Sequence, residues 1–328
     1  MHVLVIGAAG MIGRKLVGAL VDKRTIGGKN VDRLTLADLV SPEAPVFPGQ
    51  IDCVASDLSD PGVAARLVAT RPDMIFHLAA IVSGEAEADF EKGYRVNLDG
   101  TRQLFEAIRL ESAKTPYFPK LVFTSSIAVF GEPLPAIIDD THGLTPLTSY
   151  GTQKAIGELL LADYSRRGFF DGIGIRLPTI SIRPGKPNKA ASGFFSGILR
   201  EPLAGMEAVL PVSEDVRHWF ASPRAAVRFL IHAADIDTAP LGSRRSLTMP
   251  GLAATVGEEI EALRRVAGDK AVKLIRREPD ATIAKIVSGW PQSFDPRRAL
   301  ALGFEAEKSF DEIIRVHVED ELGGLMPA

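Results

Sequence analysis

The sequence predicts an α/β protein built on a doubly wound parallel sheet, with a smaller second part toward the C-terminus. Within residues 1–180, short apolar runs alternate with helical patterns, as right-handed β–α–β crossovers require. The first run, Val3 to Ile6, is apolar throughout, which is typical of a strand buried on both faces of a parallel sheet. After Pro178 the alternation stops and proline-rich segments follow, which favours loops and small elements around a ligand.

The expected elements follow in chain order. Strands are expected where short apolar or β-branched runs occur, at 3–6, 34–36, 52–55, 74–78, 121–124 and 173–177. Helices are expected where apolar residues recur three and four positions apart, at 11–23, 63–69, 86–110 and 150–167. The stretch 86–110 is expected to be irregular near Gly93 and Gly100. The later part predicts strands at 246–249 and 272–275, and helices at 221–234, 255–266, 296–302 and 310–320. We therefore expect a first domain of residues 1–180, with 221–234 packing back on it, and a mainly substrate-binding part of residues 181–328.

Composition narrows the class of protein. The chain has 328 residues, of which 46% are hydrophobic and 24% charged, and its net charge is −3. That balance argues against a nucleic-acid partner, because no basic excess exists to neutralise phosphates. The single cysteine, Cys53, excludes an internal disulfide. No run reaches the roughly 18 apolar residues of a membrane span, no leader pattern opens the chain, and no His/Asp/Glu spacing suggests a metal. The expected location is the cytoplasm.

The most specific motif is the run Gly7-Ala-Ala-Gly10-Met11-Ile12-Gly13, which lies between the first strand and the first helix. Its first two glycines permit a tight turn and the approach of backbone to a pyrophosphate. Gly13 lets the helix lie against the strand, and the helix N-terminus offers free N–H groups to phosphates. Strand, glycine turn and helix in this order predict a Rossmann-type dinucleotide site.

Asp38 indicates which dinucleotide binds. It lies 25 residues after Gly13, at the end of the second strand, where a carboxylate can accept hydrogen bonds from the ribose hydroxyls and would repel a 2′-phosphate. We therefore expect NAD and not NADP; the alternative is a solvated loop aspartate. Asp57 and Leu58, at the end of the third strand, are candidates to bracket the adenine.

A second pattern indicates proton transfer. Tyr150 and Lys154 are four residues apart and share one face of a helix. A lysine there favours the phenolate form of the tyrosine, which could take a proton from an alcohol. Ser125 and Ser126 end the fifth strand, on the side where ligands bind in such sheets.

Several motifs together resemble a known family. The glycine run, Ser126 and the Tyr150/Lys154 pair occur together with His77-Leu-Ala-Ala and with Asn97 in Val-Asn-Leu-Asp-Gly-Thr. The chain resembles the extended short-chain dehydrogenase/reductases, the superfamily that includes nucleotide-sugar epimerases. More narrowly, the segments 77–85 and 183–193 are similar to the D-erythronate dehydrogenases.

The resemblance implies a role for each matching residue. Ser126 would hold the reacting oxygen, Tyr150 would be the general acid/base and Lys154 would bind the nicotinamide ribose. Further cofactor contacts are implied at Ala79, Ala80, Asn97, Ser125, Pro178 and Thr179. Relatives pair through the helices placed here at 86–110 and 150–167, so a homodimer is expected.

The activity implied is NAD-dependent oxidation of the 2-hydroxyl of D-erythronate, or of a close short sugar acid, to the 2-keto acid. Dehydration is disfavoured because Ile127 and Ala128 follow Ser126, where dehydratases carry an Asp-Glu pair. The asparagine that epimerases often carry after the sixth strand is also missing from residues 176–180. A UDP-hexose 4-epimerase remains the alternative. A non-catalytic NAD(H)-sensing protein is a third possibility, which the intact catalytic residues disfavour.

A small hydroxy acid must be held by its carboxylate, and the planar fork of an arginine suits both oxygens. Arg183 and Arg217 are the candidates. The residues that could bind substrate hydroxyls are Ser83, Asn188, Ser192 and His218. For each of them a surface or packing role is the alternative.

Overall fold

The computed structural model describes residues 1–185 and 192–325, in two compact units. Unit 1 comprises residues 1–129, 148–176 and 227–247, and unit 2 comprises 130–147, 177–226 and 248–328. The sequence predicted one main division near residue 180, whereas here residues 130–147 belong to unit 2. Strand pairing over a long sequence separation contributes to this, because β8 (Ile138–Asp139) pairs with β16 (Phe294–Asp295).

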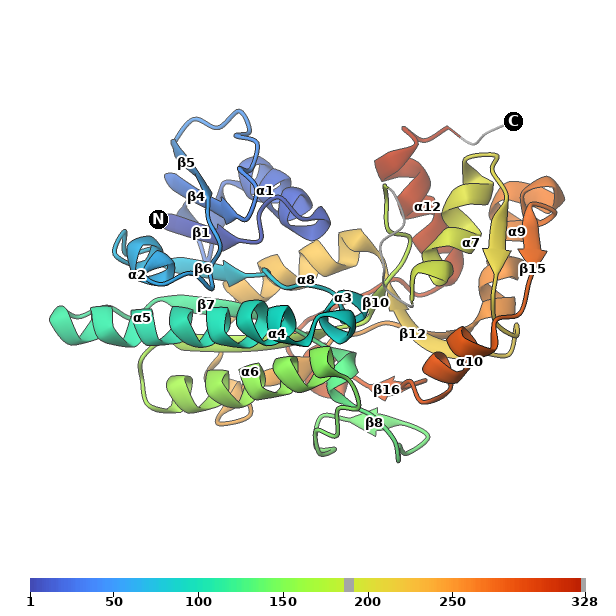
Figure 1. Ribbon diagram of the computed structural model, residues 1–328. Coiled ribbons are helices and arrows are strands. Elements are labelled where there is room, and N and C mark those ends of the chain that lie inside the picture. The colour runs from blue at the N-terminus through green and yellow to red at the C-terminus, as the bar shows by residue number, and fades with distance from the viewer. Residues whose placement is uncertain (186–191, 326–328) are drawn as a thin grey trace. The chain divides into compact units, whose positions relative to one another are not determined.

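Unit 1 is built on a seven-stranded sheet in the order β13-β9-β7-β6-β1-β4-β5. Figure 1 labels β1, β4, β5, β6 and β7 of this sheet. The pairs β1–β4, β1–β6, β4–β5 and β6–β7 are parallel. The strands are β1 (His2–Ile6), β4 (Arg33–Asp38), β5 (Gln50–Ala55), β6 (Met74–His77), β7 (Lys120–Ser126), β9 (Asp171–Leu177) and β13 (Ser246–Thr248). The predicted doubly wound α/β class is confirmed. The strand order reverses beside β1, which the glycine run follows, and ligands bind at such a point.

Helices and short elements complete unit 1. The helices are α1 (Met11–Lys23), α2 (Val63–Val68), α3 (Ser83–Ala88), α4 (Phe90–Gly93), α5 (Gly100–Lys114) and α6 (Ser149–Arg166), and α8 (Pro223–Asp235) begins in unit 2 and continues here. Short pieces add the hairpin of β2 (Thr25–Ile26) with β3 (Lys29–Asn30) and the 3₁₀ turns 127–129 and 239–241. The core includes Phe105 of α5, which lies edge-on to Phe123 of β7.

The helical stretch expected at 86–110, with irregularity near Gly93 and Gly100, is interrupted in the structure. Asp89 leaves the helical conformation (φ −128°, ψ 86°), and its side chain accepts a hydrogen bond from Lys92 N at the start of α4. Residues Tyr94–Asp99 then form a π-helix before α5 begins at Gly100. Wide turns of this kind are frequent at functional sites, and Asn97 lies in this one.

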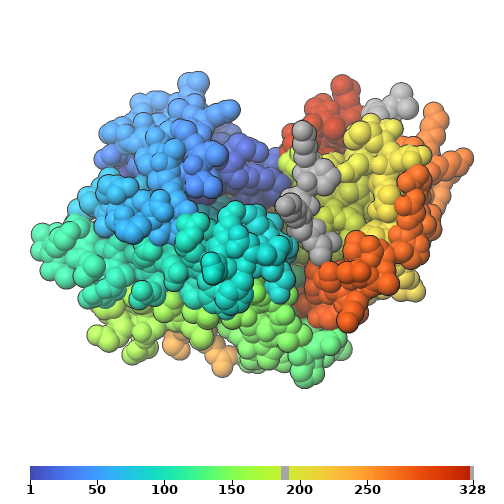
Figure 2. Space-filling model, in the orientation of Figure 1, coloured from blue at the N-terminus to red at the C-terminus, as the bar shows by residue number. Residues whose placement is uncertain are grey.

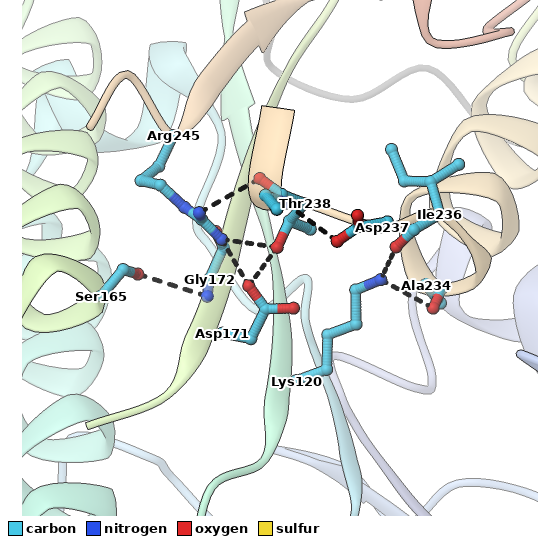
Figure 3. Close-up of polar contacts among 10 residues, drawn as sticks. Lys120, Ser165, Asp171, Gly172, Ala234, Ile236, Asp237, Thr238 and Arg245 are labelled. Carbon is cyan, nitrogen blue, oxygen red and sulfur yellow. Dashed lines mark hydrogen bonds and ion pairs between the residues drawn. The ribbon is translucent and has the colours of Figure 1, made fainter. Parts of the chain in front are cut away.

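One end of the sheet in unit 1 is fastened by a polar network (Figure 3). Lys120, the first residue of β7, donates from Nζ to the carbonyl oxygens of Ala234 and Ile236 at the end of α8. Asp171, the first residue of β9, pairs with Arg245, which also donates to Thr238. A lysine at a helix C-terminus satisfies carbonyls that have no partner within the helix, so this network fixes the last turn of α8 to the sheet.

Unit 2 combines small sheets with helices around its own core. A three-stranded sheet joins β10 (Thr179–Ile180), β12 (Arg217–Ala221) and β14 (Leu252–Thr255), and β11 (Ala208–Leu210) pairs with β15 (Ile275–Arg277). The helices are α7 (Gly193–Leu203), α9 (Val256–Val272), α10 (Ala281–Ser288), α11 (Arg297–Ala301) and α12 (Phe310–Glu321). Buried side chains such as Phe195, Phe220 and Ile313 form the core.

The strand expected at 272–275 is shifted. Helix α9 continues past a break at Gly268 (φ 81°) to Val272, and β15 begins only at Ile275. Ala271 and Val272 bury their side chains from the helix, so an apolar run that resembles a strand is split between two elements. Among the helices of residues 1–185 and 192–325, none is both long enough and apolar enough to cross a membrane.

Candidate active site

The turn after β1 has room only for glycine at two of its positions. Gly7 adopts φ +93°, and a Cβ there would lie 2.7 Å from the backbone nitrogen of Ala79. A Cβ on Gly13 would lie 2.0 Å from the carbonyl oxygen of Gly7. Gly10 begins α1 without a capping side chain, so no cap covers the first-turn N–H groups of Met11, Ile12 and Gly13. This cradle fits the pyrophosphate of a dinucleotide.

Asp38 lies against this turn. Its Oδ2 accepts a hydrogen bond from Ala9 N at 2.9 Å, and its Oδ1 accepts one from Leu39 N at 2.7 Å. The carboxylate therefore fixes the glycine turn. It is also at the end of β4, where the predicted contact with the ribose requires it.

Asp57 and Leu58 lie in a turn that the protein itself stabilises. The Asp57 carboxylate accepts hydrogen bonds from Ser59 N at 2.9 Å and from Arg95 Nη1 at 2.8 Å. Burial raises the pKa of Asp57, but the hydrogen bonds from Ser59 and Arg95 outweigh it and hold the pKa below its usual value. Leu58 is buried in the core. Contact of this pair with an adenine stays a prediction.

Asn97 holds the segment that follows β6. Its Oδ1 accepts a hydrogen bond from Ile81 N at 2.9 Å, and its Nδ2 donates to Ile81 O at 3.1 Å and to Gln153 Oε1 at 2.8 Å. The buried amide thus fixes the chain just after Ala79 and Ala80, the small pair expected beside the cofactor. Gln153 was not predicted as part of the site, although it lies between Tyr150 and Lys154 in the chain.

The reacting groups meet at the start of α6. Thr148 caps this helix by accepting a hydrogen bond from Gly151 N at 3.0 Å, which places Tyr150 in its first turn and Lys154 in the next. Lys154 Nζ donates to the carbonyl oxygen of Thr124 at 2.8 Å. Ser126, at the end of β7, lies close enough to the Tyr150 phenol to lower its pKa. Ser126, Tyr150 and Lys154 thus form one cluster.

Burial sets the protonation of this cluster. It raises the pKa of Tyr150 to about 12, an effect that the hydrogen bond with Ser126 partly offsets. Burial also lowers the pKa of Lys154 to about 8, and the carboxylate of Glu158 opposes that shift. Near neutral pH the pair is therefore a phenol beside an ammonium, and the ammonium favours proton loss from the phenol.

Two other candidate residues of unit 1 have different environments. The hydroxyl of Ser125 is buried and donates to Glu158 Oε1 at 2.5 Å, so it is already engaged inside the protein. Ser83 opens α3 and is partly exposed. Its contact with a substrate stays a prediction.

His77 serves the structure of the sheet. Its Nε2 lies 2.8 Å from Thr101 Oγ1, and that hydroxyl donates to Asn97 O. Because the hydroxyl proton is used, Nε2 must be the protonated nitrogen of a neutral ring. Burial lowers the pKa of His77 to about 3, so this histidine stays neutral at physiological pH.

In unit 2 the chain after β9 is held by a histidine. Thr179 follows Pro178, and its Oγ1 lies 2.7 Å from His218 Nε2. His218 Nδ1 lies 2.9 Å from the carbonyl oxygen of Pro291, which can only accept, so Nδ1 carries the proton and Thr179 donates to Nε2. Burial lowers the pKa of His218 to about 4. Both ring nitrogens are engaged, which leaves none for the substrate hydroxyl that the sequence suggested.

The two candidate arginines of unit 2 differ in their partners. Arg183 is partly buried and donates from Nη2 to Ser192 O at 2.9 Å and to Ser192 Oγ at 3.0 Å. No carboxylate pairs with it among residues 1–185 and 192–325. Arg217, by contrast, lies 3.5 Å from Glu258 and donates to Ala253 O. Asn188 falls outside the described residues. Within those residues, no group of His, Cys, Asp and Glu side chains could hold a metal.

Fold and site together define a dinucleotide-dependent enzyme of the short-chain dehydrogenase/reductase type. The chain belongs to the NAD dependent epimerase/dehydratase family, whose model matches residues 3–238. NAD is accordingly the cofactor, in agreement with the prediction made from Asp38.

Individual relatives carry two different descriptions. D-erythronate dehydrogenases from Cupriavidus necator and Haemophilus influenzae are 48% and 42% identical to this chain, over 98% of its length and 98% and 100% of theirs. A crystal structure described as a nucleoside-diphosphate-sugar epimerase from Agrobacterium tumefaciens is 67% identical, covers 100% of this chain and 96% of that one, and has a TM-score of 0.98. The predicted resemblance to extended short-chain dehydrogenases and to D-erythronate dehydrogenases is confirmed.

Proposed function

We propose that this protein oxidises the 2-hydroxyl of D-erythronate, or of a close short sugar acid, to the 2-keto acid with NAD, as a step of sugar acid catabolism. The observation that carries the proposal is the similarity over 98% of the chain to two D-erythronate dehydrogenases. The cluster of Ser126, Tyr150 and Lys154 supports it, because these groups can remove a proton from an alcohol.

Each residue of the cluster has a role in that reaction. Tyr150 Oη takes the proton of the substrate hydroxyl, and Ser126 holds the same oxygen by a hydrogen bond. Lys154 favours the phenolate by its charge and binds the nicotinamide ribose. Bound NAD supplies the hydride acceptor. The glycine turn and Asp38 would hold its pyrophosphate and its adenosine ribose.

We assign the substrate carboxylate to Arg183. A guanidinium does not lose its proton in a protein, so partial burial without an opposite charge is costly until an anion binds. Burial and the neighbouring Arg200 lower the pKa of Arg183, which reflects the same missing negative charge. Arg217 already has Glu258 within 3.5 Å, so it is the weaker candidate. The proposed partners of the substrate hydroxyls are Ser83, Asn188 and Ser192.

The test follows NADH formation with D-erythronate, with longer and shorter sugar acids, and with UDP-sugars. Arg183→Met should raise KM for the acid by about 10-fold or more, because a charged hydrogen bond contributes about 1.5–3 kcal/mol. NAD binding should not change. The matched variant Arg217→Met should leave KM near the wild-type value, and the opposite ranking would transfer the role to Arg217.

The alternative is a UDP-hexose 4-epimerase, which the description of the 67% identical structure favours. An epimerase would interconvert UDP-hexoses without net release of NADH. If the purified protein does this and fails to form NADH with every sugar acid, the dehydrogenase proposal is wrong.

We also propose a homodimer that pairs through α5 and α6, and a location in the cytoplasm. The two helices contact each other, their side chains form part of the surface of unit 1 (Figure 2), and they expose Leu110 (48%) and Leu159 (65%). The proposal follows the pairing of relatives through these helices, and the two exposed leucines would lie in that interface. Light scattering would measure the oligomeric state, and cell fractionation the location.

A further inference from the structure

A buried ion pair lies next to the reacting groups in unit 1. Glu158 is on α6, one helical turn after Lys154 and two turns after Tyr150. Arg176, on β9, donates to both of its oxygens, from Nε to Oε1 at 2.9 Å and from Nη2 to Oε2 at 2.7 Å. The Arg176 and Glu158 side chains are only 7% and 4% exposed. A buried ion pair often adds no net stability, so its presence here points to another role.

A third residue connects this pair to β7. Ser125 donates to Glu158 Oε1 at 2.5 Å. Its two neighbours in the strand adjoin the reacting pair, because the carbonyl oxygen of Thr124 accepts from Lys154 Nζ at 2.8 Å and Ser126 lies close enough to Tyr150 to lower the pKa of its phenol. A shift of Ser125 would therefore displace both contacts together.

Charge also connects Glu158 to Lys154. Among the described residues, the titratable groups named around Lys154 are His77 from β6, which is neutral, and Tyr150 and Glu158 from its own helix, with Arg176 from β9 behind Glu158. Besides its hydrogen bond to Thr124 O at 2.8 Å, the ammonium contacts an aromatic ring, since Nζ lies 4.9 Å from the centre of the Phe123 ring. Among the described residues, Glu158 is thus the carboxylate that opposes the loss of charge on Lys154.

We propose that Glu158 is a positioning residue for the proton-transfer pair: through Ser125 it holds the end of β7 that contacts Tyr150 and Lys154, and its negative charge keeps Lys154 charged. Arg176 fixes the orientation of that carboxylate by its two hydrogen bonds. The inference rests on the proposed function only in that Tyr150 and Lys154 carry out the proton transfer.

The double variant Glu158→Gln/Arg176→Met tests the role of charge. It removes both charges at similar volume, so no guanidinium is left buried without a partner, and the new amide can still accept from Ser125. In the oxidation direction, the acid limb of the kcat–pH profile should move upward by up to about one pH unit, because Glu158 is the charged group that acts on Lys154, whereas the loss of Arg176 partly opposes the effect. On that limb kcat falls by up to about tenfold, while KM stays unchanged.

Two single variants separate the roles of charge and of position. Glu158→Asp keeps the negative charge, so the acid limb of its kcat–pH profile should lie at the wild-type pH, even if the variant is less stable. Ser125→Ala removes only the link to β7, and the pH-independent kcat should fall about tenfold, since small misplacements of reacting groups are costly. If the double variant does not fold, the two single variants still test the proposal. A wild-type kcat in Ser125→Ala, or a shifted acid limb of the kcat–pH profile in Glu158→Asp, would overturn it.

The control is a second ion pair that involves the same strand. Asp171 begins β9 and pairs with Arg245 (Figure 3), in a network that does not include the reacting groups. The variant Asp171→Asn/Arg245→Met should leave the acid limb in place. An equal shift in this control would mean that loosening β9 is sufficient, and the specific role of Glu158 would be refuted.

A readout without substrate keeps this test independent of the proposed function. The chain has four tyrosines, so the difference in tyrosinate absorbance between each protein and its Tyr150→Phe counterpart, both saturated with NAD, follows Tyr150 alone. The Tyr150 titration should move upward in Glu158→Gln/Arg176→Met, and an unchanged titration would overturn the proposal. If D-erythronate is not oxidised by the wild type, only the proposed function fails.

Discussion

A single methyl group at Gly13 provides a sharp test of the cofactor site. In the structure a Cβ at this position would lie 2.0 Å from Gly7 O and 2.8 Å from the Cα of Ala8. Non-bonded heavy atoms pack at about 3.5–4.0 Å, so the variant Gly13→Ala must push the glycine turn and the start of α1 apart by more than about 1 Å. The backbone N–H groups of the turn then no longer point at the pyrophosphate together.

The magnitude follows from the hydrogen bonds that such a shift disrupts. A hydrogen bond to a charged group contributes about 1.5–3 kcal/mol, so the loss of one of them weakens NADH binding about 10- to 100-fold. Overpacking costs a further 1–3 kcal/mol or so of folding stability. Titration calorimetry with NADH and denaturant unfolding would measure the two effects separately.

Gly18→Ala is the matched control. Gly18 is exposed in the same helix α1, and no atom lies within 4 Å of its added Cβ. Alanine is the better helix former, so this variant should gain about 0.5–1 kcal/mol of stability and bind NADH like the wild type. If Gly13→Ala binds NADH with an affinity within about twofold of the wild type, the glycine turn does not hold the pyrophosphate as proposed, because the loss of one charged hydrogen bond would weaken binding by about tenfold or more.

Three further outcomes are expected. Asp38→Ala should weaken NAD binding and narrow the preference for NAD over NADP, because it removes both the predicted ribose contact and the repulsion of a 2′-phosphate. A kcat/KM of the wild-type protein that favours NADP would contradict the assignment of NAD. Tyr150→Phe should lower kcat by about 10²–10⁴-fold while NADH still binds, and an active variant with an unchanged pH profile would show that the base is another group. His77 and His218 are buried with their pKa values lowered by burial to about 3 and about 4, so the unfolded state binds more protons and stability falls as the pH drops below about 6.5. Each histidine should account for a loss of about 2 kcal/mol of stability between pH 7 and pH 5. Urea unfolding at pH 7 and pH 5 would measure this loss, and an equal loss in His77→Gln would contradict the contribution of His77.

The predictions for the cofactor half of the candidate site come from local patterns. The apolar run Val3 to Ile6 and the glycine turn after it are determined by neighbours in sequence, because strand burial and a tight turn each need particular residues at fixed offsets. The Tyr150/Lys154 pair is likewise visible, since four residues bring two side chains to one face of a helix. The structure adds the distances and burial that fix their protonation.

Features that depend on distant partners were missed. Irregularity near Gly93 and Gly100 was expected, but the π-helix between them was not, because it accompanies the hydrogen bonds of Asn97 with Ile81 and Gln153, and helix periodicity does not report such contacts. Glu158 and Arg176 resemble solvated charges in the sequence, because charged residues are rarely buried. The structure shows that Glu158 of α6 and Arg176 of β9 face each other inside unit 1.

Two ionisable side chains removed from solvent in this protein differ in whether they can become neutral. Glu259 is fully buried and its carboxyl oxygens have no hydrogen-bond partner among the described residues. Burial raises its pKa well above the usual value, so the group becomes neutral and needs no counter-charge. Arg183 stays charged, since a guanidinium keeps its proton. No carboxylate pairs with it in the part of the chain that the structure describes. Of the two, only the arginine is therefore a candidate to bind an anion from outside the chain, as we propose for the carboxylate of a short sugar acid.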